Sequence, residues 1–227
     1  MSIDTKLRGH EIRIDGGGMH CIGAWLAEPI GKPRGGIVVA QEIFGVNAHI
    51  RSVVERFAAL GYVAIAPAFF DHVENDVELD YDRAGIAAGK KLVTELGLDR
   101  TVADVASAAA SIASAGKIGF VGYCWGGTVA YLAAARLAMP SVSYYGMRNV
   151  HYFDEAPQAP MQFHFGENDK SIPPDMIERH RRELANAEVF TYPADHGFNC
   201  DARAAYDAAS ASLALHRTLE FFERELG

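Results

Sequence analysis

Short apolar runs alternate along the chain with longer stretches in which apolar residues recur at helical spacing. Apolar residues at Ile50, Val53, Val54, Phe57 and Leu60 have the period of a helix, and Gly61 follows as a stop signal. Similar stretches predict helices over 99–114, 126–137, 175–187 and 206–226. The apolar runs predict strands over 12–14, 21–27, 36–40, 62–66, 118–121, 142–145, 162–165 and 189–192. This alternation is typical of an α/β fold with a mostly parallel sheet and helices on both faces.

Two segments depart from the simple alternation. The first two runs flank Gly16, Gly17 and Gly18, which predicts an antiparallel N-terminal hairpin, because glycine tolerates the backbone angles of a tight turn. The stretch 69–97 is acidic and aperiodic, and we expect a loop followed by a short helix there. This loop leaves the carboxyl end of a strand, where open α/β sheets bind ligands. No repeat or linker divides the chain, so we expect one domain over 1–227.

The motif with the most chemical content is Gly122-Tyr123-Cys124-Trp125-Gly126, at the junction of a predicted strand and a predicted helix. A nucleophile on so sharp a turn requires small flanking residues, and both flanks are glycine. The start of the following helix would direct amides and its positive dipole end at the sulfur, favouring a thiolate and a developing oxyanion. Free cysteines are more often small buried hydrophobes, and Cys21 and Cys200 keep that interpretation. The glycine spacing favours Cys124 as a nucleophile.

A nucleophile of this kind requires an acid and a base, which follow it in that order in α/β-hydrolases. Asp169 follows the predicted strand 162–165 in a polar loop and is the candidate acid, with Glu167 as a weaker alternative. His196 follows the next strand and is the candidate base. His180 and His216 lie in helical stretches instead. Because parallel strands end at one edge of a sheet, Cys124, Asp169 and His196 should converge there.

The predicted oxyanion donors are the backbone amides of Trp125, directly after the nucleophile, and Ile43, in the loop after strand 36–40. Glu42 is unusual beside a thiol, since its carboxylate would disfavour the thiolate and could keep the cysteine protonated until substrate arrives. The alternative interpretation of Glu42 is a carboxylate at the start of a helix.

Four features of the sequence resemble the dienelactone hydrolase family within the α/β-hydrolase superfamily. They are the segments QEIFGVN and GYCWGG, an aspartate after a strand, and a histidine in HGF. The resemblance covers essentially the whole chain. It implies a largely monomeric, cytoplasmic hydrolase that opens the lactone ring of dienelactones without a cofactor. It also implies Cys124, Asp169 and His196 as the triad, Ile43 and Trp125 as oxyanion donors, and Glu42 as the carboxylate that governs the resting cysteine.

The best-known members of that family bind the substrate carboxylate with two arginines. Arg83 is the candidate for the first. The second is absent from its expected place, which Cys200 occupies, and the nearest later arginine is Arg203. A tyrosine expected one helical turn after the first arginine is replaced by Ala87. Both departures weaken the carry-over of dienelactone as the substrate and leave the hydrolytic residues in place. The remaining candidate substrate-binding residues are three aromatics near the triad: Phe44, Tyr123 and Phe198.

Composition narrows the function classes. The 227 residues are 49% hydrophobic and 22% charged, which is ordinary for a globular protein and excludes disordered and fibrous classes. A net charge of −8 argues against nucleic acid and anionic lipid as partners. No secretory signal or membrane-spanning run is recognisable, and the cysteines show no zinc spacing, so we expect a cytoplasmic protein without a zinc site. The family resemblance further implies a monomer or weak homodimer with no metal or cofactor.

Two other functions remain open at this stage. One is a general carboxylesterase or thioesterase acting on small neutral acyl substrates. The other is a non-catalytic binding or redox-sensing member of the fold, with Cys124 as a reactive thiol.

Overall fold

The computed structural model describes residues 8–16 and 20–227. Its eight strands form one sheet in the order β1-β2-β4-β3-β5-β6-β7-β8. The strands are β1 His10–Asp15, β2 Cys21–Ala27, β3 Gly36–Ala40, β4 Val63–Pro67, β5 Ile118–Tyr123, β6 Ser141–Tyr144, β7 Met161–Gly166 and β8 Glu188–Tyr192. Strand β2 is antiparallel to both β1 and β4, and all pairs from β4 to β8 are parallel. The sheet confirms the expected α/β-hydrolase fold and its antiparallel N-terminal hairpin; Gly17 and Gly18 of the predicted turn lie outside the described residues.

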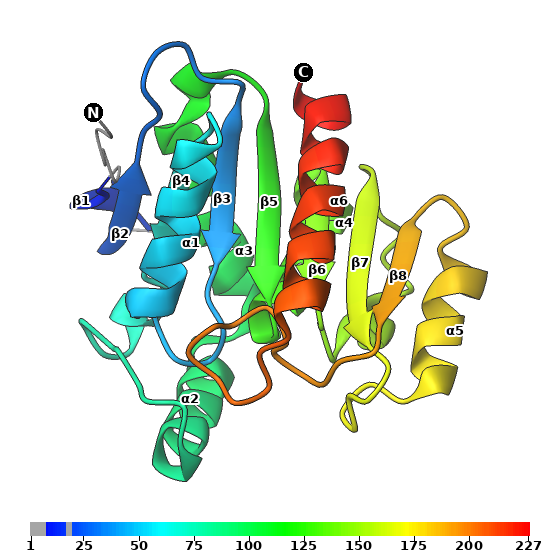
Figure 1. Ribbon diagram of the computed structural model, residues 1–227. Helices are drawn as coiled ribbons and strands as arrows, with labels where there is room; N and C mark the ends of the chain where they lie inside the picture. The colour runs from blue at the N-terminus through cyan, green and yellow to red at the C-terminus, as the bar shows by residue number, and fades with distance from the viewer. Residues whose placement is uncertain (1–7, 17–19) are drawn as a thin grey trace, which may run out of the picture.

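Helices cover both faces of this sheet, as expected. The α-helices are α1 Ala48–Ala59, α2 Arg83–Leu96, α3 Leu98–Ser111, α4 Trp125–Leu137, α5 Pro174–Glu183 and α6 Ala208–Leu226. Helices α1 and α6 lie in front of the sheet in Figure 1, and α3 and α4 lie behind it. The core strands are buried along their length; all five residues of β3, for example, are buried. This burial explains why these strands read as continuous apolar runs.

The helix in segment 69–97 is longer than the short helix expected there. Helix α2 has 14 residues, and Asp82 caps its start by accepting a hydrogen bond from the Gly85 amide. Gly85 and Gly89 lower the helix propensity of this stretch, which is why the sequence underestimates it. Their absence of side chains has a packing reason, because a Cβ atom on Gly89 would lie 2.0 Å from the carbonyl oxygen of Ile43. Helix α2 therefore packs directly on the loop that follows β3.

Helix α5 shows the opposite error. It ends at Glu183, four residues before the predicted end at residue 187. Its buried residues Ile177 and His180 face the sheet, and the His180 ring contacts Phe163 and Phe165 of β7. The apolar residues after Glu183 belong to the turn leading into β8, so their pattern extended the predicted helix too far.

The carboxyl ends of the parallel strands meet at the lower edge of the sheet in Figure 1. Helix α2 and the long loop between β8 and α6 lie at the same edge (Figure 1). This is the edge at which open α/β sheets bind ligands.

Candidate active site

Three loops at this edge carry the residues expected to form a triad. Cys124 lies between β5 and α4, Asp169 follows β7, and His196 follows β8. The structure brings all three together. His196 Nε2 lies 3.1 Å from Cys124 Sγ, and His196 Nδ1 lies 2.6 Å from Asp169 Oδ2.

The turn at Cys124 has the strained backbone that its flanking glycines suggested. Cys124 has φ 55° and ψ −112°, a conformation that non-glycine residues rarely adopt. A Cβ atom on Gly122 would lie 1.8 Å from the carbonyl oxygen of Gly126. A Cβ atom on Gly126 would lie 2.5 Å from the carbonyl oxygen of Gln41, so the second glycine brings α4 against the loop after β3. The sharp turn presents the sulfur to the site at the first residue before α4.

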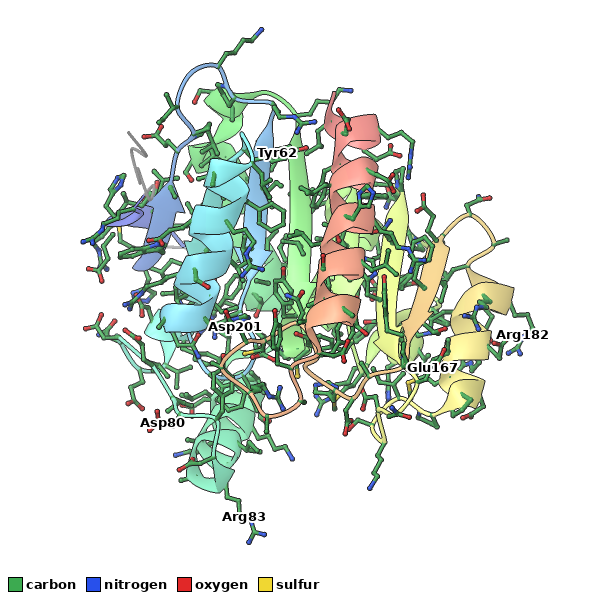
Figure 2. The ribbon with its side chains drawn as sticks, viewed as in Figure 1. Tyr62, Asp80, Arg83, Glu167, Arg182 and Asp201 are labelled. Carbon is green, nitrogen blue, oxygen red and sulfur yellow. The ribbon has the colours of Figure 1, made fainter. Side chains whose placement is uncertain are left out.

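The acid is distinguished from its neighbour by burial. The Asp169 side chain is fully buried, and its second oxygen, Oδ1, accepts a hydrogen bond from the Ser171 amide 2.8 Å away. Glu167, the weaker sequence alternative, is exposed, and Figure 2 shows it at the surface near the end of β8. Both oxygens of Asp169 are therefore held, one by a backbone amide and one by His196, which fixes the orientation of the imidazole ring.

The charged form of His196 is favoured in this setting. Burial by itself lowers the pKa of His196, but the charge of the Cys124 sulfur and the hydrogen bond to Asp169 outweigh burial and raise it to about 10. The Tyr145 ring lies 5.0 Å from the imidazole, centroid to centroid, and covers one side of it. An imidazole with this pKa retains a proton received from the thiol at neutral pH.

The two residues expected to supply oxyanion donors, Ile43 and Trp125, line the same cavity as Cys124 and His196. Trp125 is the first residue of α4, and the amide of a first helical residue has no acceptor within its own helix. It is therefore available to an oxygen bound next to Cys124.

Glu42 and Arg203 form a largely buried ion pair. The Glu42 side chain is 1% exposed, and its Oε1 accepts a hydrogen bond from Arg203 Nη1 at 3.1 Å. Its other oxygen, Oε2, is buried and has no hydrogen-bond partner among the described residues. Burial alone would lower the pKa of Arg203, but the Glu42 carboxylate reverses this effect and raises it. Burial, and to a smaller extent the nearby Glu42 carboxylate, raises the pKa of the Cys200 thiol to about 11.

The cavity beside Cys124 has a volume of about 240 Å³. Of the candidate substrate-binding residues, Phe44 and Arg203 line it. Arg83 does not: it is exposed, and in Figure 2 it points away from the body of the protein at the tip of α2. Tyr123 and Phe198 are buried outside the cavity lining, where their rings pack against Tyr144 and other core aromatics.

Several lining residues were missed by sequence reasoning. Helix α2 contributes Ile86, Lys90 and Val93, at the spacing of one helix face. The segment after β6 contributes Met147 and Arg148. The spacing of these residues on α2 can identify lining residues only once the face of α2 that meets the site is known. That face is indicated by the packing of Gly89, which the sequence does not reveal.

Within residues 8–16 and 20–227, no three His, Cys, Asp or Glu side chains are grouped so that they could hold a metal ion. No helix in the same ranges is long and apolar enough to cross a membrane.

The chain is similar to known proteins in sequence and in fold. The sequence profile of the dienelactone hydrolase family matches residues 22–226. Carboxymethylenebutenolidase 1 of Cupriavidus pinatubonensis is 30% identical, over 93% of this chain and 94% of its own. The carboxymethylenebutenolidase of Pseudomonas putida is 32% identical, over 89% of this chain and 91% of its own. A crystal structure from Klebsiella pneumoniae, described as a putative dienelactone hydrolase, superposes with a TM-score of 0.82 at 30% identity, covering 94% of this chain and 98% of the other.

The fold and these relatives define the chain as a carboxylic-ester hydrolase of the α/β-hydrolase type. More specifically, it belongs to the dienelactone hydrolase family.

Proposed function

We propose that the protein hydrolyses a lactone or small ester through a Cys124-His196-Asp169 triad and a thioester acyl-enzyme. The observation that carries this proposal is the position of His196, whose two ring nitrogens lie 3.1 Å from Cys124 Sγ and 2.6 Å from Asp169 Oδ2. This is the relation of nucleophile, base and orienting acid required for covalent catalysis.

The first half of the reaction forms the acyl-enzyme. His196 takes the proton of the Cys124 thiol, and the sulfur attacks the ester carbonyl carbon. The amides of Trp125 and Ile43 donate hydrogen bonds to the resulting oxyanion. As the carbon–oxygen ester bond breaks, the imidazolium gives its proton to the leaving alkoxide, and an acyl group remains on the sulfur.

The second half releases the acid. His196, now neutral, removes a proton from water, which attacks the thioester carbonyl. The sulfur leaves as a thiolate, and the imidazolium remains beside it. With a lactone the alkoxide stays tethered to the acyl group, so protonation by His196 also opposes re-closure of the ring.

Arg203 is the cation we assign to a substrate carboxylate. It lines the cavity and donates a hydrogen bond to Glu42, whose other oxygen has no partner among the described residues. A carboxylate that takes over Arg203 would release Glu42 from its ion pair. Binding of an anionic substrate would thereby free Glu42, which the family resemblance implies to be the carboxylate that governs the resting cysteine.

A neutral-ester hydrolase is the second candidate function. The exposed position of Arg83 outside the cavity favours it, because this removes one of the two expected carboxylate-binding arginines. We further infer that the protein acts as one domain in the cytoplasm, as a monomer or weak homodimer. A catalytic thiol is kept reduced in the cytoplasm, and the family profile spans nearly the whole chain.

The test is steady-state hydrolysis of a dienelactone, a neutral lactone and an activated acetyl ester by wild-type protein and the Cys124→Ala variant. We expect the variant to lose at least about 1000-fold in kcat/KM on every substrate that the wild type cleaves. Preference for the anionic dienelactone would support the Arg203 assignment, and turnover of only the neutral substrates would support the second candidate. Undiminished hydrolysis by Cys124→Ala would refute both. Absence of turnover by the wild type, with reversible oxidation of Cys124, would favour the redox-sensing alternative.

A further inference from the structure

Apart from Cys124 and His196, the charged residues lining the cavity are all cations. They are Lys90, Arg148 and Arg203, and no Asp or Glu is among the lining residues of the described chain. This contrasts with the net charge of −8 for the whole protein. A local excess of positive charge at the entrance to a site attracts anionic ligands and raises their rate of association.

Lys90 and Arg148 differ from Arg203 in their pairing. Arg203 is neutralised by Glu42, whereas Lys90 and Arg148 are exposed and have no ion-pair partner within residues 8–16 and 20–227. Cations without carboxylate partners are free to bind an anion without first breaking an internal ion pair. They therefore form a binding element separate from the Glu42–Arg203 pair.

The backbone fixes both residues beside the site. The Arg148 amide donates a hydrogen bond to the hydroxyl of Thr128, 3.2 Å away, and Thr128 is a buried residue of α4. Lys90 follows Gly89, which packs directly on the carbonyl of Ile43, and Lys90 and Ile43 line the same cavity. The two cations thus come from different elements, α2 and the segment after β6, and both line the cavity that contains Cys124.

We propose that Lys90 and Arg148 form a second anion-binding subsite in the outer part of the cavity, and that the preferred ester is a dicarboxylate. One carboxylate is bound by Arg203 and the other by the Lys90 and Arg148 pair. This inference rests on the proposed function for the ester chemistry. Arginine offers a planar pair of donors and lysine a mobile point charge, a combination suited to a carboxylate. The cavity of about 240 Å³ is smaller than typical pockets for drug-sized ligands, so the dicarboxylate is a small molecule.

The kinetic test uses four activated esters that separate the two charges. They are 4-nitrophenyl acetate, mono(4-nitrophenyl) glutarate, 3-carboxy-4-nitrophenyl acetate and the 3-carboxy-4-nitrophenyl monoester of glutarate. The wild type should have its highest kcat/KM on the last, which carries two carboxylates. The double variant Lys90→Met with Arg148→Met should lose about 10-fold on this ester, mainly through KM, and stay within about 2-fold of wild type on neutral acetate.

A charge-matched control is available. Arg83→Met with Arg182→Met also removes two exposed cations, and neither residue lines the cavity. Figure 2 shows both side chains at the periphery of the molecule. This control should retain the preference for the doubly charged ester. An equal loss in the control would assign the effect to overall charge and overturn the proposal, as would the absence of any preference for two carboxylates in the wild type.

A binding measurement separates this inference from the proposed function. Glutarate and butyrate are titrated calorimetrically into Cys124→Ala, which needs no turnover. Glutarate should bind more tightly than butyrate, and the advantage should vanish when Lys90→Met and Arg148→Met are added. Equal binding of the two acids contradicts the subsite even if Cys124-dependent hydrolysis is found. Tighter binding of glutarate supports it even if none of the esters is cleaved.

Discussion

The sharp turn at residues 122–126, which we call the elbow, and the cavity wall formed by α2 differ in the range of the contacts that determine their geometry. In the elbow, five consecutive residues determine the geometry, because Gly122 and Gly126 permit contacts that any side chain would block. In the wall, the decisive contact joins Gly89 to the carbonyl of Ile43, residues far apart in the sequence. On this helix Lys90 lines the cavity, whereas Arg83 lies outside it.

This difference separates reaction type from substrate choice. The positions of the elbow and of the proposed acid and base are specified by local sequence and by the meeting of parallel strand ends at one edge. The wall is specified by the packing of a helix on a loop, which local sequence does not reveal. Family membership therefore informs the chemistry of this site more strongly than its selectivity, and the following predictions test that separation.

The largest expected effect is on the chemistry side of the comparison. Asp169→Asn should lower kcat by about 1000-fold on charged and neutral esters alike, because it disturbs the orientation and charge stabilisation of His196. Glu167→Gln is the matched control, since Glu167 is two residues away and exposed, and it should stay near wild-type activity. Steady-state kinetics of both variants decide the matter. A larger loss in Glu167→Gln would reassign the acid.

The next effect tests whether the elbow depends on its glycine. Gly122→Ala should destabilise the protein by about 3 kcal/mol, because the added Cβ would lie 1.8 Å from the Gly126 carbonyl oxygen. Gly31→Ala is the control: nothing lies within 4 Å of its added Cβ, and only the cost of its φ of +90° remains. That cost is about 1 kcal/mol. Urea denaturation of both variants gives the comparison, and equal losses would show that the elbow contact is not limiting.

On the selectivity side, Arg203→Met should destabilise the protein by about 2 kcal/mol, because it leaves the Glu42 carboxylate buried without its cation. Adding Glu42→Gln should restore part of this loss by removing the unpaired charge. Preference for anionic esters should fall in both variants. Urea denaturation and kinetics on charged and neutral esters measure the two effects. Unchanged stability of Arg203→Met would contradict the ion pair as a structural element.

The smallest effect is a pH dependence of the site itself. Because the folded pKa of His196 is raised to about 10, its contribution to stability is fully present below its unfolded pKa of about 6.5 and is lost as pH rises through about 10. The rate on alkyl esters should likewise fall about 10-fold per pH unit above 10, as the imidazolium that protonates the leaving group disappears. Glu167→Gln should keep this limb, and Asp169→Asn should shift it to lower pH. A pH–rate profile with no alkaline limb would contradict this role.

The sequence predicted most of what is local and missed what depends on tertiary contacts. The strand order along the chain, the elbow, and the candidate positions of Cys124, Asp169 and His196 follow from glycine spacing and alternating periodicity. The length of α2 was underestimated because Gly85 and Gly89 have low helix propensity, and only their packing explains them. The expectation that Arg83 binds substrate fails because the face of α2 that meets the cavity depends on tertiary packing, and Arg83 lies outside that cavity. The carboxylate binding we assign to Arg203 remains a prediction.

The most direct test of the central claim is to trap the acyl group. Wild-type protein is mixed with an activated ester, quenched in acid within milliseconds, and analysed by intact-protein and peptide mass spectrometry. The account predicts an acyl adduct on the peptide containing Cys124 that is released by hydroxylamine and absent from Cys124→Ala. Turnover that continues in Cys124→Ala, or an adduct that forms on another residue, would contradict it.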